Sequence, residues 1–286
     1  MDAITWFDPE RASNLLKILA GVLALVLLVC SARAIRRRGL PHELGEFLAN
    51  LSCGLGMYLI STVTFRWLHS LADERMTGRG PWHVDNPLLA IVICTVTVDF
   101  LSYVYHVVAH KTRFLWSLHV VHHSARHFNL SLGPRQSWLE RMIVVPLCYV
   151  PLSMVLCWAL NLDFWYLVIG HQIIFLSAFL SHTTAWERWP LGLSRIFINP
   201  IEHKMHHGIE EKYFDCNFGF CLRCWDVMFG TYRAPDVAMA EIAVGVAEHP
   251  VTEKALLIQA QTLTYLAPRP SVTASATSAP LPAGAE

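Results

Sequence analysis

Long apolar runs constrain the fold of this chain more than any other feature of its sequence. They cover about residues 15–30, 47–65, 88–108 and 142–182. One helix needs about 20 apolar residues to cross a bilayer, so the last run predicts two crossings joined by a turn at residues 161–165. Charged residues make up 15% of the chain, against about 25% in soluble domains. We therefore expect an all-α integral membrane protein with about five transmembrane helices.

Basic residues set the expected orientation of these helices. Four arginines within residues 33–38 follow the first run, whereas the segment before that run is acidic. A secretory signal has the opposite arrangement, so we expect a retained membrane helix. The positive-inside rule places these arginines in the cytoplasm, and five crossings then bring the basic segments 111–141 and 188–212 to the same side. The N-terminus is expected outside.

Eight of the 15 histidines fall into three short clusters beside the apolar runs. His106 and His110 are spaced i, i+4 at the end of the third run, so they share one helical face. The pattern His-x-x-His-His then occurs twice, as His119, His122 and His123, and as His203, His206 and His207. Successive helical residues diverge by about 100°. We expect the first two members of each trio to share a face, so that a trio serves two metal ions, or one ion from two directions.

The expected topology brings all three clusters to the cytoplasmic membrane surface. Imidazole binds iron, zinc, copper and nickel, and eight ligands exceed the four of a structural zinc site. They fit two metal ions with open positions better than they fit unrelated surface histidines. His182, near the cytoplasmic end of the last run, is expected to be a further ligand. His171 lies three turns deeper and is expected to line the substrate cavity or to hydrogen-bond within the bundle.

These motifs resemble those of the fatty acid hydroxylase superfamily, also called the sterol desaturase family. The stretches that carry the resemblance are "DFLSYVYHVVAH", "LWSLHVVHHSARHFN", "FLSHTT", "NPIEHKMHHG" and "YFDCNFGFCLRCWDVMFGTY". They are nearest to the alkylglycerol monooxygenase and sterol desaturase branches. "LGPRQSW" departs from the family pattern, in which Thr-Ala precedes the Arg, and this departure bears on substrate preference. The resemblance covers roughly residues 88–235.

The resemblance implies a non-haem di-iron centre that uses O2 to oxidise a C–H bond of a lipid with a fatty acyl, alkyl ether or sterol-like structure. Hydroxylation is the expected outcome, and desaturation at the same centre is the alternative. The metal ligands would be His106, His110, His119, His122, His123, His182, His203, His206 and His207. Outside them, the residues expected to orient the histidine rings or to line the substrate cavity are His171, Asp99, Tyr103, Asn199 and Asp215. For Asn217 and Asp226, orienting a ring and making capping or turn hydrogen bonds are equally expected.

The electrons for such a reaction are expected from another protein. No G-x-G-x-x-G motif follows a strand, so we expect a ferredoxin, a cytochrome or an NAD(P)H-dependent reductase as the external electron donor. Basic loops around Lys111, Arg113, Lys204 and Lys212 would dock an acidic donor or contact anionic headgroups. The formal net charge of zero gives no indication of a nucleic-acid partner, and the sequence leaves the oligomeric state open.

Two rival functions fit the sequence less well. A membrane metalloprotease would need H-E-x-x-H, and "HELGE" at His42 has Glu46 where the second ligand would stand. A metal transporter would need ligands near the bilayer midplane, and of the histidines in the apolar runs only His171 approaches that depth.

The sequence divides into four expected segments. Residues 1–87 hold the N-terminal membrane helices and their connecting loop, and residues 88–235 form the catalytic domain that the resemblance implies. Residues 236–266 form a C-terminal extension with one helix over residues 252–266. The Pro/Ala/Ser-rich residues 267–286 are expected to be a disordered tail.

Overall fold

The computed structural model describes residues 8–38, 41–76, 80–144, 147, 150–246 and 259. Within these ranges the chain is helical and forms no β-strand, only two isolated bridges. The predicted tail, and the predicted helix over residues 252–266 apart from Gln259, lie outside the described residues. The helices are α1 (Pro9–Arg38), α2 (Pro41–Met76), α3 (Pro87–Lys111), α4 (Arg113–His123), η1 (Leu130–Leu132), α5 (Trp138–Val144), α6 (Val150–Ala159), α7 (Phe164–Ser181), η3 (Leu193–Arg195), α8 (Pro200–His206), η4 (Glu211–Tyr213), α9 (Cys224–Phe229) and η5 (Met239–Glu241).

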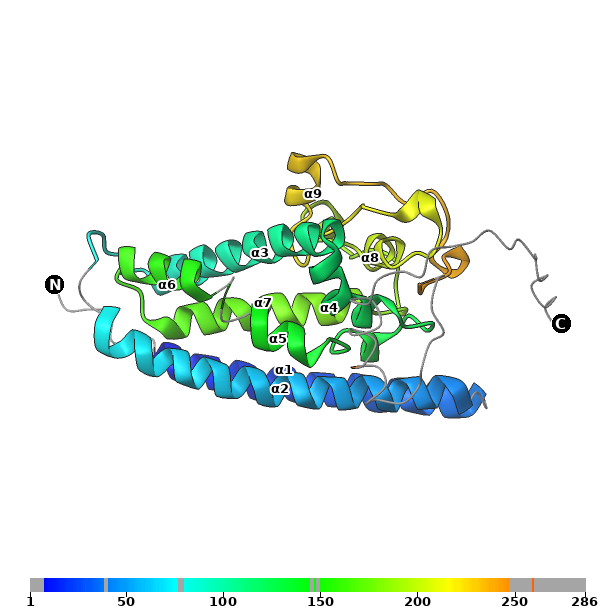
Figure 1. Cartoon of the computed structure of the whole chain (residues 1–286), viewed down its shortest axis with the longest axis horizontal. Coiled ribbons are helices and arrows are strands. Elements are labelled where there is room, and N and C mark those ends of the chain that lie inside the picture. Colours follow the sequence, from blue (N-terminus) through cyan, green and yellow to red (C-terminus); the bar gives the residue numbers. More distant parts are fainter. Residues whose placement is uncertain are drawn as a thin grey trace.

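The long helices form a layered bundle (Figure 1). α1 and α2 run side by side, and α7 lies between this pair and α3. The short helices α4 and α8 gather at one end of the bundle, with α6 toward the other end. α9 lies on the side of α3 that faces away from α1 and α2. The bundle therefore supports one helical cap at the end where α3 and α7 finish.

α3 and α7 approach each other closely because a glycine lies at their contact. A Cβ atom on Gly170 would lie 3.0 Å from the carbonyl carbon of Cys94 and 3.0 Å from the backbone nitrogen of Thr95. Buried apolar side chains of both helices, including Val98 and Leu167, pack around this contact. The missing side chain thus sets the spacing of the two helices that lead into the cap.

Replacing Gly170 with alanine is expected to destabilise the bundle by about 1–3 kcal/mol, because the added methyl group meets backbone atoms that cannot move aside alone. The measurement is the thermal unfolding midpoint in detergent. Gly21→Ala on α1 is the matched control, since its Cβ would meet nothing within 4 Å. Equal midpoints for the two variants would contradict a tight α3–α7 contact.

Three described helices are long and apolar enough to cross a membrane. They are Leu44–Leu68 within α2, Pro87–Lys111 and Phe164–Ser181. The turn predicted at residues 161–165 is confirmed, since α6 ends at Ala159 and α7 begins at Phe164, with Asn161 in the left-handed region at φ 50°. Among the described residues before this turn, Trp138–Val144 form α5 and Val150–Ala159 form α6. The count of five crossings stays a prediction.

Local sequence signals fix the helix ends that lead into the cap. α3 ends at Lys111 and α4 begins at Arg113, so a single residue turns the chain between two histidine clusters. At the start of α8, the side chain of Glu202 accepts a hydrogen bond from the backbone N–H of Asn199 at 2.8 Å, as in a capping box, and Pro200 occupies the first turn. Both joints are tight, so they hold the histidines at defined positions.

Candidate metal centre

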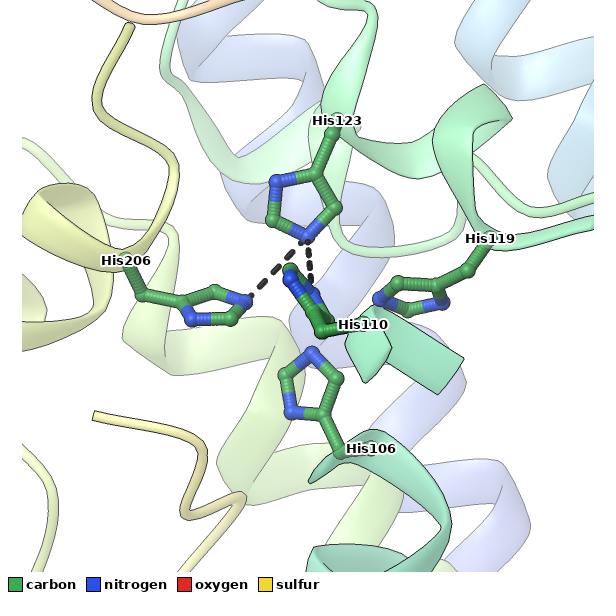
Figure 2. Close-up of side chains that lie close together, drawn as sticks. All are labelled: His106, His110, His119, His123 and His206. Atoms are coloured by element: carbon green, nitrogen blue, oxygen red, sulfur yellow. Dashed lines mark hydrogen bonds between the residues drawn. The ribbon is translucent and has the colours of Figure 1, made fainter. Parts of the chain in front are cut away.

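The structure brings all nine predicted ligand histidines together, in two adjoining groups. In each group the candidate ligand atoms lie within 4.8 Å of one another. The five-histidine group comprises His106, His110, His119, His123 and His206, and the four-histidine group comprises His122, His182, His203 and His207. Figure 2 shows the five rings of the first group converging from α3, α4 and α8. Helices distant in sequence therefore build each group.

Each His-x-x-His-His trio contributes to both groups, but not in the pairing predicted. On α4, His119 and His123 join the five-histidine group and His122 joins the other. The expectation that His119 would share a face with His122 was therefore wrong. At about 100° per residue, i and i+4 differ by about 40° around the helix, whereas i and i+3 differ by about 60°. The second trio divides in the same way, with His206 alone in the five-histidine group.

The two groups touch through stacked imidazole rings. The ring of His123 lies 4.3 Å from that of His207, with 21° between their planes. His182, directly after the last residue of α7, enters the four-histidine group with its Nε2 atom 3.0 Å from Nε2 of His203. The C-terminal end of the candidate span Phe164–Ser181 therefore lies beside the four-histidine group.

Backbone carbonyls hold the outer nitrogen of several rings. The Nδ1 atoms of His106, His122, His182 and His206 lie 2.7, 3.0, 2.7 and 2.9 Å from the carbonyl oxygens of Phe218, Arg135, Ala178 and Cys216 respectively. A carbonyl only accepts, so each Nδ1 must carry the proton. Each Nε2 then presents a lone pair to its group, as in metal-bound histidines.

The Nε2 atoms that point into the two groups are better placed to bind a metal ion than to hydrogen-bond one another. Among the described residues, the Nε2 atoms of His106, His119 and His207 are buried and have no hydrogen-bond partner. Nε2 of His123 lies 3.1 Å from Nε2 of His110 and 3.2 Å from that of His206. Buried polar atoms without partners are costly. A cation among these lone pairs would satisfy them, so the donor set fits metal ions in both groups.

Burial keeps these imidazoles neutral. It lowers the pKa of His122, His123, His203 and His207 well below the ordinary value, and the neighbouring rings lower it further. Burial also lowers the pKa of His206 to about 3 and that of His182 to about 4. A metal requires the neutral ring, so the cap holds its histidines in the binding form at neutral pH.

Glu140 on α5 supports one ring and was not predicted. Its Oε1 atom lies 3.1 Å from Nδ1 of His119 and accepts a hydrogen bond from the Tyr105 hydroxyl at 2.7 Å. Burial favours a raised pKa, but His119 and these hydrogen bonds hold the pKa of Glu140 below its ordinary value. The carboxylate is therefore ionised, and its charge makes Nε2 of His119 a stronger ligand for a metal ion. The signal for it was an acidic residue shortly after the second histidine cluster, beside an apolar run.

Replacing Glu140 with glutamine is expected to weaken metal binding at the five-histidine group by about 10- to 100-fold, the usual cost of losing an outer partner of a ligand. The amide keeps the shape of the side chain and removes its charge. Competition with a chelator measures the affinity. Glu211→Gln, at an exposed position, is the matched control and should leave the affinity unchanged. Equal affinities for both variants would contradict this role of Glu140.

Arg135 is completely buried and organises the end of α4. Its guanidinium donates hydrogen bonds to the carbonyl oxygen of Val121 at 2.7 Å, to Oδ1 of Asn50 at 2.9 Å and to Oγ of Ser124 at 2.7 Å. Its own carbonyl oxygen holds the His122 ring. One residue thus connects α2, the end of α4 and the four-histidine group. The sequence pattern marked only its neighbours as a departure from the family motif.

Within the described residues, Asp99 contacts the loop before α9 and does not hydrogen-bond a histidine ring directly. Its carboxylate accepts hydrogen bonds from the backbone N–H groups of Cys221 and Leu222 at 3.0 Å each, and from the Trp225 indole at 2.9 Å. The same loop carries Phe218, whose carbonyl oxygen holds His106. Asp226, for which a supporting role and a turn role were equally expected, accepts from the N–H groups of residues 218 and 219. The two carboxylates therefore fix the carbonyl that orients a histidine.

In the described part of the chain, the other predicted supporting residues contact groups other than the histidine rings. Asn199 caps α8, the Tyr103 hydroxyl is 2.9 Å from Oγ1 of Thr231, and Asp215 forms a surface ion pair with Lys111. Asn217 adopts φ 55° and bonds the backbone of residue 233.

His171 lies outside both histidine groups. Its Nδ1 atom is 3.0 Å from the carbonyl oxygen of Leu167, and its ring packs edge-on against Phe65. His171 thus takes part in contacts within the bundle, one of the two roles expected for it.

Comparison with known proteins matches the same part of the chain. The fatty acid hydroxylase family model matches residues 91–231. Alkylglycerol monooxygenase from Homo sapiens is 31% identical over 221 residues, 74% of this chain and 46% of that protein. The Danio rerio protein of the same name is 33% identical over 202 residues, 68% of this chain and 42% of its own. Ornithine lipid hydroxylase OlsE from Rhizobium tropici is 28% identical over 145 residues, 51% of this chain and 42% of its own. The chain thus spans less than half the length of these relatives. No solved structure matches it significantly.

Proposed function

Because the chain belongs to the fatty acid hydroxylase family, we propose that it is a membrane-bound di-iron oxygenase that hydroxylates a C–H bond of a lipid. The observation that carries this proposal is the pair of buried, neutral histidine groups. Their nine imidazoles exceed the needs of a structural zinc site, which takes four ligands. One iron ion in each group would account for every predicted ligand.

The chain's own residues would prepare this site in three ways. The carbonyl partners keep protons on Nδ1, and Glu140 adds negative charge behind His119. Aromatic rings of Trp116 and Phe220 pack 4.9 Å from the rings of His110 and His106, which limits the access of water. Bound iron would supply the chemistry of O2 activation. The overall reaction consumes the lipid, O2, two electrons and two protons, and yields the hydroxylated lipid and water.

The substrate is proposed to be a lipid that reaches the site from the bilayer. The names of the relatives refer to alkylglycerols and to ornithine lipids as their substrates. Here His106 and His110 lie on the last turns of one candidate span, and His182 directly follows another. An apolar chain in the membrane would therefore lie close to the metal ions, while the polar groups of the lipid remain at the surface.

The orientation and the electron source belong to the same proposal. Five crossings would put the histidine groups on the cytoplasmic side, where a ferredoxin, a cytochrome or an NAD(P)H-dependent reductase would supply electrons. A cysteine at the exposed position Glu210 tests the orientation. A membrane-impermeant thiol reagent should label it in opened cells and not in intact cells. Labelling in intact cells would contradict the cytoplasmic assignment.

The reaction is tested with purified, iron-loaded protein, a reductant system, a membrane lipid extract and 18O2. One 18O atom in a lipid product, with two irons per chain, is the expected result. An unlabelled alkene would show desaturation at the same centre. Movement of metal across proteoliposomes without O2 uptake would show a transporter and would refute the oxygenase.

A further inference from the structure

α9 presents apolar side chains on its outer surface. Val227, Met228 and Phe229 are all exposed, and Met228 is 67% exposed. A contiguous exposed apolar surface of this kind usually meets an apolar partner. The helix rests on α3, where the Phe229 ring stacks on the rings of Phe100 and Tyr103, at 6.1 and 5.5 Å. The partner of α9 must therefore be one that is present beside a candidate membrane span.

The position of α9 along α3 gives its depth. Phe100 precedes the last residue of α3, Lys111, by eleven positions, or about 16 Å at 1.5 Å per residue. The hydrocarbon core of a bilayer is about 30 Å thick. Exposed apolar side chains on α3 continue on both sides of the contact, with Val92 before Phe100 and Val104 after it. α9 thus packs on α3 between two stretches where exposed side chains of α3 are apolar.

We propose that residues 221–229 form a re-entrant element embedded in the bilayer, with the outer side of α9 facing lipid acyl chains. The lipid is favoured over another protein because the exposed surface of α9 is continuous with the exposed side of a membrane helix. The inference concerns the membrane contact alone. It rests on α3 crossing the bilayer and holds whatever reaction the centre performs.

Backbone N–H groups of this segment are paired inside the protein, as a position within the bilayer requires. Non-helical backbone within a bilayer persists only where its polar groups are paired inside the protein. Asp99 accepts from the backbone N–H groups of residues 221 and 222, and Asp226 accepts from those of residues 218 and 219. A carboxylate inside a span is costly and usually has a specific use. Pairing the backbone of the re-entrant segment is such a use for Asp99.

A neighbouring loop also carries exposed apolar side chains, although Arg195 between two of them is exposed as well. The carbonyl oxygen of Ile196 accepts a hydrogen bond from the Arg223 N–H at 2.9 Å, which joins this loop to the start of α9. Ile196 and Leu193 are exposed, and Leu191 at the tip is 95% exposed with φ 56°. A leucine rarely adopts this left-handed conformation. An apolar residue held outward in this way is consistent with a loop that enters the interface.

The residues just before the embedded segment reach the five-histidine group. Phe218, three positions before residue 221, holds His106 through its carbonyl oxygen, and the ring of Phe220, directly before it, lies 4.9 Å from the His106 ring. If the proposed oxygenase function holds, the side of α3 that carries α9 is where a lipid chain would approach the metal ions.

The test is the accessibility of a nitroxide label in phosphatidylcholine proteoliposomes. Met228→Cys is labelled in a Cys224→Ser background, since Cys224 is the exposed cysteine of the described residues. The spin relaxation caused by O2, which concentrates in hydrocarbon, is compared with that caused by an aqueous nickel chelate. Val92→Cys serves as the lipid control and Glu210→Cys as the water control. The background protein without an introduced cysteine gives the signal to subtract.

The expected result is that the label at position 228 responds to O2 several-fold more than to nickel, as at position 92, with the reverse at position 210. A response at 228 like that at 210 would overturn the proposal. A label at 228 that is shielded from both reagents and broadened by a second label would identify another copy as the partner, which also overturns it. A water-like response at 92 would refute the span itself. Lipid oxidation with 18O2 is measured separately, so failure of the embedding is distinct from failure of the function.

Discussion

Replacing His123 with alanine is expected to abolish lipid oxidation and to lower the iron affinity by more than about 100-fold. Loss of a residue that only hydrogen-bonds a metal ligand costs up to about 100-fold, and loss of a ligand should cost more. His123 is central to the site. Its Nε2 atom lies 3.1 Å from that of His110 and 3.2 Å from that of His206, and its ring stacks on His207 of the other group. Its loss therefore removes one candidate ligand of the five-histidine group and the ring contact between the two groups.

Iron per chain, measured after removal of loosely bound metal, gives the readout, together with product formation from the lipid extract. His83→Ala is the matched control, because His83 is exposed in the loop before α3 and belongs to neither group. The unfolding midpoint of the metal-free proteins shows whether His123→Ala retains its fold. Full iron content and activity in a folded His123→Ala protein would refute the metal centre as proposed.

Replacing Arg135 with leucine is expected to destabilise the cap by about 3 kcal/mol or more, since several partners in a buried network lose their donor. The guanidinium donates to three groups at the end of α4 and on α2, including the carbonyl oxygen of Val121 and Oδ1 of Asn50. The carbonyl of Arg135 also holds His122 at 3.0 Å, so a shifted backbone would disturb the four-histidine group. Iron binding should fall with stability.

Arg126→Leu provides the comparison, because the Arg126 side chain is exposed on the same stretch of chain. Unfolding in detergent and iron content are measured for both. Arg135→Lys keeps a positive charge without the forked donor geometry and is expected to recover part of the loss at most. If Arg135→Leu unfolded at the same temperature as Arg126→Leu, the buried network would not be what stabilises the cap.

The sequence alone identified the apolar helices, the turn before α7 and the histidines that the structure brings together. Apolar length depends on composition, so the runs at residues 88–108 and 142–182 were readable directly. The spacing of His106 and His110 and the repeated trio indicated a shared site, because helical periodicity converts spacing into direction. The resemblance to the fatty acid hydroxylase family, read from the same motifs, is confirmed by the family match over residues 91–231.

The tertiary structure alone decided how the histidines divide and what holds them. The partition of each trio depends on which neighbouring helix faces each side chain, and the expected pairing of His119 with His122 failed for that reason. The partners of Nδ1 are mostly backbone carbonyls, which every residue possesses and no sequence pattern distinguishes. Glu140 and Arg135 are single charged residues without a periodic pattern. Their roles arise because α5 and the segment before it fold against α4, and burial there makes each unpaired polar group costly.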